Sequence, residues 1–343
     1  MKIVLHLTER CNLRCSYCLE RHHTKSMSLD TAVAAIEQLM TSDKDTVVFF
    51  GGEPLLEEET LFAVCHWAET HYPRHFSFVL TTNGTMVDED FLDKARKFNL
   101  HIAISCDGIP SAHDRNRKDI HGKGTSHVAL NCLKRLLLEE PETLVKMTLP
   151  ANNVRDFTSS IVMLVGMGVK NISTTIDMDV RRWNDDSFEA LRLSYPHVAR
   201  FYLDCIEDGK PFTFSMFEKR FRLDVHQCGF GKSVVVVSED GCFFPCTGFV
   251  RNQDFCIGDV KVGLQKKQLF ELFQKAHSIA DSESCHGCEL FGQCPCRCAC
   301  RNFRMTGSFS PHPVFCRHEK ILFETIQYIK SEANRRNIKL PVF

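Results

Sequence analysis

Three cysteines near the amino terminus have the spacing of a metal-cluster site. Cys11, Cys15 and Cys18 are separated by three and two residues and directly follow a short apolar run. Three thiolates on one tight loop can hold three irons of a four-iron, four-sulfur (4Fe-4S) cubane, and the last iron is then open to another ligand because no fourth cysteine lies near. A zinc knuckle, or three unrelated thiols, would also fit this spacing.

The elements around this loop alternate between strands and helices. Residues 2–8 (KIVLHLT) predict a strand, so the cysteines follow the carboxyl end of a strand, where α/β barrels place their active sites. Further strands are predicted at residues 46–50, 76–82, 101–106, 145–149 and 171–177. Helices are predicted at residues 29–40, capped by Ser28, and at 57–70, 89–98, 127–138, 154–167 and 187–207.

Six strand and helix pairs predict an α/β fold in which a parallel sheet curls into a partial (β/α)6 barrel over residues 1–207. The pattern then changes. A β-hairpin is predicted at residues 234–245, because Glu239-Asp240-Gly241 contains the Asp-Gly turn signal. A helix near residues 268–279, a cysteine-rich loop and a final helix at 318–335 follow. We therefore expect a second, smaller domain over residues 208–343, organised by metal rather than by a large apolar core.

Three short motifs follow the predicted strands in order. Gly51-Gly52-Glu53-Pro54 follows the second strand, Thr81-Thr82-Asn83-Gly84-Thr85 closes the third, and Ser105-Cys106-Asp107-Gly108 closes the fourth. Paired glycines leave the main chain open to close approach by a polar ligand. Together with the cysteine spacing and with Tyr17 just before Cys18, this order of motifs resembles the radical S-adenosyl-L-methionine (SAM) enzymes.

The resemblance implies a cofactor and a reaction. In that family SAM chelates the open iron, and an electron from the reduced cluster breaks the sulfonium to give a 5'-deoxyadenosyl radical that abstracts hydrogen from the substrate. The glycine motif would bind the amino group of SAM, while Ser105 and Arg117 would hold its carboxylate, which suits the fork of a guanidinium. A solvated surface position is the alternative for Arg117. The residues expected to contact SAM are Tyr17, Gly51, Gly52, Glu53, Pro54, Thr82, Asn83, Ser105, Asp107 and Arg117.

A second resemblance lies in the later cysteines. The spacings Cys228-x12-Gly241-x4-Cys246, then Cys285-x2-Cys288-x5-Cys294-x3-Cys298, then Cys316 match the SPASM extension of radical SAM enzymes, which carries two auxiliary 4Fe-4S clusters. Three clusters in all are implied. A pair of structural zinc sites is the competing interpretation, since thiolates at two-residue spacing suit zinc as well. By the resemblance, one cluster is held by Cys285, Cys288, Cys294 and Cys316, and the other by Cys228, Cys246 and Cys298.

The second of these ligand sets is one thiolate short. Cys242 is a substitute, but in an extended strand its Cα would lie about 13 Å from that of Cys246 at roughly 3.3 Å per residue, which is long for two ligands of one cubane. Cys256, Cys296 and Cys300 are other candidates. The sequence thus predicts an iron without a protein thiolate, which a substrate cysteine would occupy, and this favours a thioether product.

Composition narrows the class of protein. The chain has 343 residues, 42 Lys and Arg against 43 Asp and Glu, and a formal net charge of -1, so nucleic acid and membrane surfaces are not expected partners. There is no run of 18 apolar residues and no signal peptide at the amino terminus, which predicts a cytoplasmic protein. The 18 cysteines are then better explained by metal or cluster ligation than by disulfides. Cys65, Cys132 and Cys205 fall in predicted helices and are assigned no function.

Three functions follow from these patterns. The first is a radical SAM/SPASM maturase that abstracts hydrogen from a residue of a ribosomally made peptide (RiPP), to form a thioether or another cross-link. The second is an anaerobic sulfatase-type maturase that oxidises Cys or Ser to formylglycine. The third is a non-catalytic iron-sulfur or zinc-binding protein, which would leave the Gly51 to Pro54 motif unexplained. The expected partners of an enzyme are a peptide or protein substrate, reduced flavodoxin or ferredoxin as electron donor, and a separate peptide-recognition protein, because the motif begins at Cys11 with no domain before it.

Overall fold

A computed structural model describes residues 1–20, 22–221, 230–277, 285, 287–291, 294 and 298–341. The chain divides into two compact units. The first consists of Met1–Arg14, Cys18–Ala103 and Gln227–Ile279, and the second of Cys15–Tyr17, Ile104–His226 and Ala280–Phe343. The units interleave along the chain, so the division into 1–207 and 208–343 stays a prediction about functional domains.

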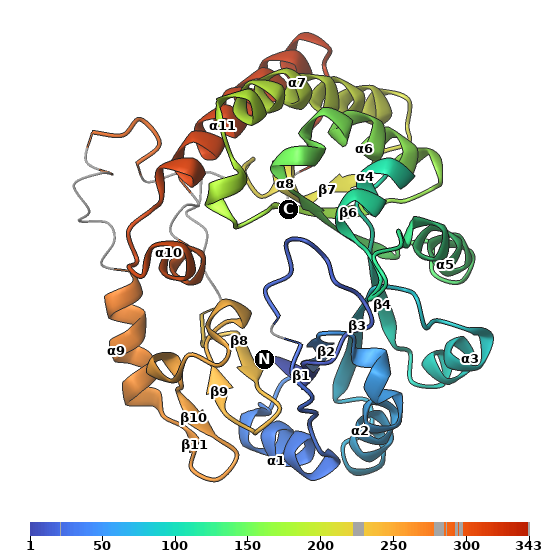
Figure 1. Cartoon of the computed structure of the whole chain (residues 1–343), viewed down its shortest axis with the longest axis vertical. Coiled ribbons are helices and arrows are strands. Elements are labelled where there is room, and N and C mark those ends of the chain that lie inside the picture. Colours follow the sequence, from blue (N-terminus) through green and yellow to red (C-terminus); the bar gives the residue numbers. More distant parts are fainter. Residues whose placement is uncertain are drawn as a thin grey trace. The chain divides into compact units, whose positions relative to one another are not determined.

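The first unit is built on a mostly parallel sheet. Strands β1 (Lys2–Thr8), β2 (Asp45–Gly51) and β3 (Phe76–Thr82) pair in parallel, with Lys2 opposite Thr46 and Thr46 opposite Ser77. Helices α1 (Leu29–Leu39), α2 (Glu58–His71) and α3 (Glu89–Lys97) connect or follow these strands (Figure 1). On its other side β1 pairs in parallel with β8 (Val234–Val237), which forms an antiparallel hairpin with β9 (Phe243–Phe244). The hairpin β10 (Gly258–Asp259) and β11 (Gly263–Leu264) and helix α9 (Lys266–His277) complete the unit.

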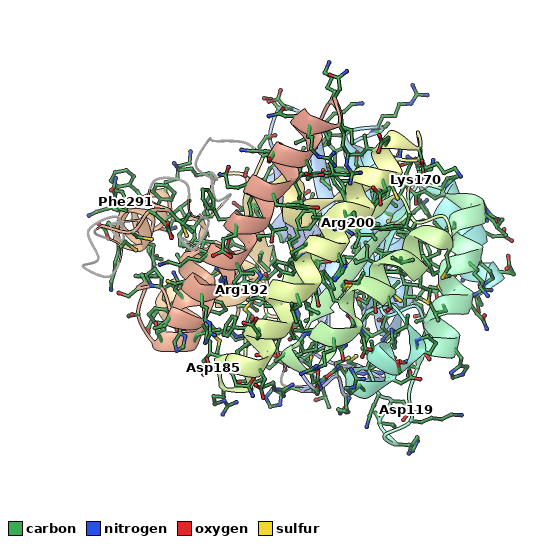
Figure 2. The ribbon with its side chains drawn as sticks, turned by 90° about the horizontal axis from the view of Figure 1, so that it is seen from above. Asp119, Lys170, Asp185, Arg192, Arg200 and Phe291 are labelled. Atoms are coloured by element: carbon green, nitrogen blue, oxygen red, sulfur yellow. The ribbon has the colours of Figure 1, made fainter. Side chains whose placement is uncertain are left out.

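The second unit continues the same βα pattern. Strand β4 (His101–Ser105) ends here, and β5 (Leu144–Leu149), β6 (Asn171–Ile176) and β7 (Thr213–Phe214) pair in parallel. The helices are α4 (Pro110–Asn116), α5 (Ser126–Glu139), α6 (Phe157–Gly166), α7 (Asp185–Glu207), α8 (Ser215–Glu218), α10 (Ala299–Thr306) and α11 (Pro313–Arg335). Helices α7 and α11 lie side by side, and Arg192 of α7 donates to Glu324 of α11 at 3.0 Å (Figure 2).

The predicted strands and most helices are confirmed within one or two residues. Ser28 caps α1 as expected, accepting from the Thr31 amide at 3.1 Å. Two expectations need correction. The predicted helix at 154–167 begins with a 3-10 turn, Ala151–Asp156, and is α-helical only from Phe157. The predicted final helix begins five residues earlier, at Pro313, because proline is favoured in the first turn of a helix.

The residues after 207 hold more apolar core than the sequence predicted. Valines 235 to 237 of β8 are fully buried, and so are Phe243 and Phe244 of β9. Parallel strands covered on both faces carry such continuous apolar runs. Apolar packing therefore stabilises residues 230–277, in addition to any metal that their cysteines bind. None of the described helices is long and apolar enough to cross a membrane.

A buried network of charges joins β1 to the β8–β9 hairpin within the first unit. His6, which is 1% exposed, contacts Glu239 at 2.6 Å and Glu20 at 3.2 Å. Arg251 binds the same two carboxylates, each at 2.8 Å, and also pairs with Glu9. Burial by itself lowers the pKa of His6, but the two carboxylates outweigh it and raise that pKa to about 9. His6 is therefore a cation at neutral pH.

Replacing His6 should destabilise the protein in a pH-dependent way. Because the pKa of His6 is raised on folding, its stabilising contribution is complete below the unfolded value near 6.5 and is lost as pH rises through about 9. His6→Gln should lower the free energy of unfolding by about 3 kcal/mol more at pH 6.5 than at pH 10. Urea unfolding of both proteins across this range measures the difference. The exposed His66→Gln is the control, and a pH-independent effect of His6→Gln would contradict the assignment.

Candidate active site

The loop after β1 presents the three cysteines as thiols rather than disulfides. Cys11 and Cys15 are half-buried and Cys18 is exposed. The backbone amide of Leu13 donates to the Cys11 sulfur at 3.4 Å, and the amide of Glu20 donates to the Cys18 sulfur at 3.4 Å. Amide donors to sulfur are among the interactions that tune iron-sulfur clusters. The donor set and its hydrogen bonds fit a cluster.

No group of three or more His, Cys, Asp or Glu side chains converges on a single metal ion anywhere in the described part of the chain. This includes the three cysteines of the loop. A cubane binds each thiolate through a separate iron, so its ligands need not meet at one point.

Gly51 and Gly52 bring the end of β2 against the backbone that leads into the cysteine loop. The amide of Gly52 donates to the Thr8 carbonyl at 2.7 Å, and the amide of Glu53 donates to the Arg10 carbonyl at 2.8 Å. A Cβ on Gly52 would lie 2.1 Å from the Arg10 oxygen, and Gly51 has a φ of +137°. The sequence suggested that these glycines expose backbone to a ligand. In the structure, the approaching group is the chain itself.

Glu53 organises the end of β3. Its carboxylate is 1% exposed and accepts from the Thr82 hydroxyl at 2.7 Å, the Asn83 amide at 2.8 Å and the Leu55 amide at 3.2 Å. Burial raises the pKa of Glu53 to about 7, against the lowering effect of these hydrogen bonds. The Asn83 side chain in turn donates to Asn12 at 2.9 Å, and its amide nitrogen lies 4.0 Å from the Cys11 sulfur. Two of the predicted site motifs are thus joined to the first cysteine.

The middle of the cysteine loop is fixed by residues of the second unit, to which it belongs. The Ser16 amide donates to the Asn116 carbonyl at 2.9 Å and its hydroxyl donates to the Asn116 side chain at 2.7 Å. Arg182 donates to the Ser16 carbonyl at 2.7 Å. Both the backbone and the side chain of Ser16 are therefore hydrogen-bonded to residues of the second unit.

A buried ion pair stands beside Tyr17. Arg117 donates to both oxygens of Asp107, at 3.0 and 3.1 Å, and Tyr17 donates to the same carboxylate with its ring 5.4 Å from the guanidinium. Asp107 also accepts from the Thr148 amide at 3.0 Å. Arg117 is only 7% exposed, so it is not the solvated surface cation considered above. Among the described residues, no acceptor is found for Arg117 Nη1, and Ser105, two residues before Asp107, is half-exposed.

The later cysteines are distributed over both units. Cys242, Cys246 and Cys256 belong to the first, and Cys285, Cys288, Cys294, Cys298, Cys300 and Cys316 to the second. Cys228 and Cys296 lie outside the described residues. The Cys242 thiol is hydrogen-bonded to that of Cys256, and burial raises its pKa to about 11. The Cys298 sulfur lies 3.4 Å from that of Cys300, and this contact lowers the pKa of Cys298 to about 6.

Comparison with known proteins identifies the first part of the chain. Residues 5–157 match the model of the Radical SAM superfamily. These residues are a radical SAM domain. The chain therefore contains a radical SAM domain, and this domain implies a 4Fe-4S cluster and SAM.

Relatives extend the likeness beyond that domain. A cysteine-type anaerobic sulfatase-maturating enzyme of Clostridium novyi is 23% identical over 372 residues, covering 92% of each chain. The solved structure of anSMEcpe with bound AdoMet (SAM) and Cp18Cys peptide has a TM-score of 0.79 at 20% identity, covering 98% of this chain and 99% of the other. SuiB of Streptococcus suis bound to its precursor peptide SuiA has a TM-score of 0.67 at 12% identity, covering 91% and 75%. The chain spans only 60% and 40% of the first two curated relatives it matches.

These matches confirm the predicted fold, a radical SAM partial barrel with a cysteine-rich carboxyl-terminal part like that of enzymes with a SPASM domain. Sequence reasoning missed several residues that hold the cysteine loop: Asn12, Ser16, Asn116, Arg182 and the His6 network. Asn116 directly precedes Arg117, which the sequence analysis did single out. Arg182 had no local signal, because its contact with Ser16 joins residues 166 positions apart.

Arg117→Ala should destabilise the fold by about 3 to 5 kcal/mol, because it leaves the buried Asp107 carboxylate without its cation. The exposed Arg181, which pairs with Asp179 at 2.8 Å, provides a matched control. Arg181→Ala should change stability by less than about 0.5 kcal/mol. Denaturant unfolding of the two variants tests this, and equal effects would show that the Asp107 pair is not buried in solution.

Proposed function

We propose that the protein is a radical SAM maturase that abstracts hydrogen from a residue of a peptide or protein substrate. The observation that carries this proposal is the radical SAM domain combined with an end-to-end fold match to anSMEcpe, a structure that holds both AdoMet and a peptide. When bound, the cluster and SAM supply a 5'-deoxyadenosyl radical that takes hydrogen from the substrate. Cys11, Cys15 and Cys18 would hold that cluster.

The other residues of the site would hold the cysteine loop in position or bind SAM. Gly52 and Glu53 fix the start of the cysteine loop through their amides, Ser16 is held at its middle, and Arg117 offers Nη1 to the SAM carboxylate. Removing Arg117 should weaken SAM binding roughly tenfold to a hundredfold, the loss expected for a charged hydrogen bond of about 1.5 to 3 kcal/mol. Two sets of predicted residues belong to this proposal. One is the ten residues expected to contact SAM, and the other is the cysteines expected to ligate the auxiliary clusters.

Two products are candidates, each with its own support. Formylglycine formation is favoured by the match over 92% of both chains to a cysteine-type sulfatase-maturating enzyme. A thioether or another cross-link in a ribosomally made peptide is favoured by the predicted ligand set Cys228, Cys246 and Cys298, which is one thiolate short. Reduced flavodoxin or ferredoxin would supply the electron, and a cytoplasmic location follows from this partner.

The primary test removes the SAM-cleaving cluster. Changing Cys11, Cys15 and Cys18 together to Ala should abolish 5'-deoxyadenosine formation and lower iron by about four per chain, one cubane's worth. Chromatography of dithionite-reduced reactions and iron analysis measure the two effects. Cys65→Ala, a change at a thiol buried in α2, is the control and should keep both. SAM cleavage by a fully iron-loaded triple variant would refute the proposal.

The product is identified by mass spectrometry of a peptide expressed together with the enzyme. Oxidation of a substrate cysteine to formylglycine replaces the thiol sulfur, released as sulfide, by an oxygen from water, with net loss of two hydrogens, and leaves an aldehyde that reacts with hydrazides. A thioether cross-link loses about two hydrogens and blocks a cysteine against alkylation. If the enzyme cleaves SAM but neither mass change is found in the peptides expressed with it, the proposal of a peptide or protein substrate is wrong.

A further inference from the structure

Two carboxylates stand on either side of the cysteine loop. Glu9 lies two residues before Cys11, and Glu20 lies two residues after Cys18. All four residues belong to the first unit. The side chain of Glu9 is 3% exposed and that of Glu20 is 18% exposed. Carboxylates that are so largely removed from water need a charge partner inside the protein.

A single arginine of the same unit binds both carboxylates. Arg251 donates from Nη1 to Glu20 at 2.8 Å, and its Nε forms an ion pair with Glu9. Its Nη2 donates to Glu239, the second residue after β8, at 2.8 Å. The other oxygen of Glu9, Oε2, is buried and has no hydrogen-bond partner among the described residues. Glu9 therefore depends on the Arg251 guanidinium to balance its charge.

The backbone of Arg251 has a conformation that is unfavourable for arginine. Its φ is +68°, in the left-handed region that favours glycine. The neighbouring Phe249 anchors this segment, because its buried ring stacks on that of Phe255 with the centroids 3.9 Å apart and meets the ring of Phe230 at 5.8 Å. Strained residues persist where their surroundings fix them, and they gather at functional sites. The strain here places the guanidinium between Glu9 and Glu20.

The connection between β1 and the β8–β9 hairpin does not require Arg251. Strands β1 and β8 pair in parallel (Figure 1), and His6 contacts Glu239 at 2.6 Å. Arg251 adds contacts to the residues that flank the cysteine loop. Its contact with Glu20 bears directly on a cysteine, because the Glu20 amide donates to the Cys18 sulfur at 3.4 Å. Hydrogen bonds to sulfur are among the factors that set the reduction potential of an iron-sulfur cluster.

We propose that Arg251 is a positioning residue for the cluster of the cysteine loop: through Glu9 and Glu20 it fixes both ends of the loop and holds the amide donor on Cys18. The inference rests on the proposed function, in which this loop holds the SAM-cleaving cluster. Without the guanidinium, Glu20 is released and the hydrogen bond to the Cys18 sulfur weakens. A positive charge beside the loop is lost as well. Both changes disfavour the reduced, more negative cluster, so its reduction potential falls.

Redox titration of the anaerobically reconstituted protein tests this role, followed by the part of its EPR signal that changes when SAM is added. Arg251→Ala should keep the wild-type iron content, shift the potential of that signal to more negative values and slow SAM cleavage about tenfold to a hundredfold, the range for residues that support a metal ligand. Arg251→Lys keeps the charge but not the fork, so its potential should shift in the same direction. The control is Arg96→Ala, a change at an exposed arginine of α3 that pairs with Asp93, and it should match wild type.

A double variant shows whether Arg251 acts through Glu20. In a Glu20→Ala background, Arg251→Ala should shift the potential less than it does in the wild-type chain, because the side chain that it holds is already absent. Equal shifts in the two backgrounds would show that Arg251 does not act through Glu20.

Two further results would overturn the inference. A wild-type potential and a wild-type SAM-dependent EPR signal in Arg251→Ala would show that the arginine serves only the stability of the fold. If Arg251→Ala fails to fold, Arg251→Lys decides alone, and a wild-type potential in that variant would show that the charge matters and the position of the loop does not. Failure of the proposed function is seen separately: a wild-type protein that neither cleaves SAM nor changes its EPR signal with SAM would refute that function and this inference with it.

Discussion

The backbone of residues 8–10 and the backbone of Gly51 and Gly52 lie in direct contact, and the entry of the cysteine loop depends on this approach. Two amide-to-carbonyl hydrogen bonds join them, at 2.7 and 2.8 Å. Any side chain at position 52 would collide with the Arg10 carbonyl. The glycine motif therefore acts first as a structural constraint: it lets β1 and β2 end together, so that the loop leaves the sheet at a fixed point.

The polar groups that hold the rest of the loop are buried, which makes them costly to leave unpaired. Glu53 meets three donors, Asp107 meets Arg117, Tyr17 and the Thr148 amide, and His6 meets two carboxylates. Replacing such groups by apolar ones is often tolerated, but removing one partner alone is strongly destabilising. Each network therefore specifies one arrangement of the loop. A radical reaction benefits from this, because a reactive group must be held close to the bond it attacks.

Local patterns in the sequence were sufficient to predict the strands and most of the helices. The alternation in residues 2–8 and the cap at Ser28 depend only on neighbours in the chain, and both are present in the structure. The pairing of β8 with β1 could not be predicted, because four valines in a row indicate a buried strand without naming its partner. The Asp107 contact of Arg117 was missed for a related reason. A sequence shows a cation near a carboxylate, but it does not show whether either group is buried. Burial decides whether the cation pairs within the protein or stays available to bind a ligand.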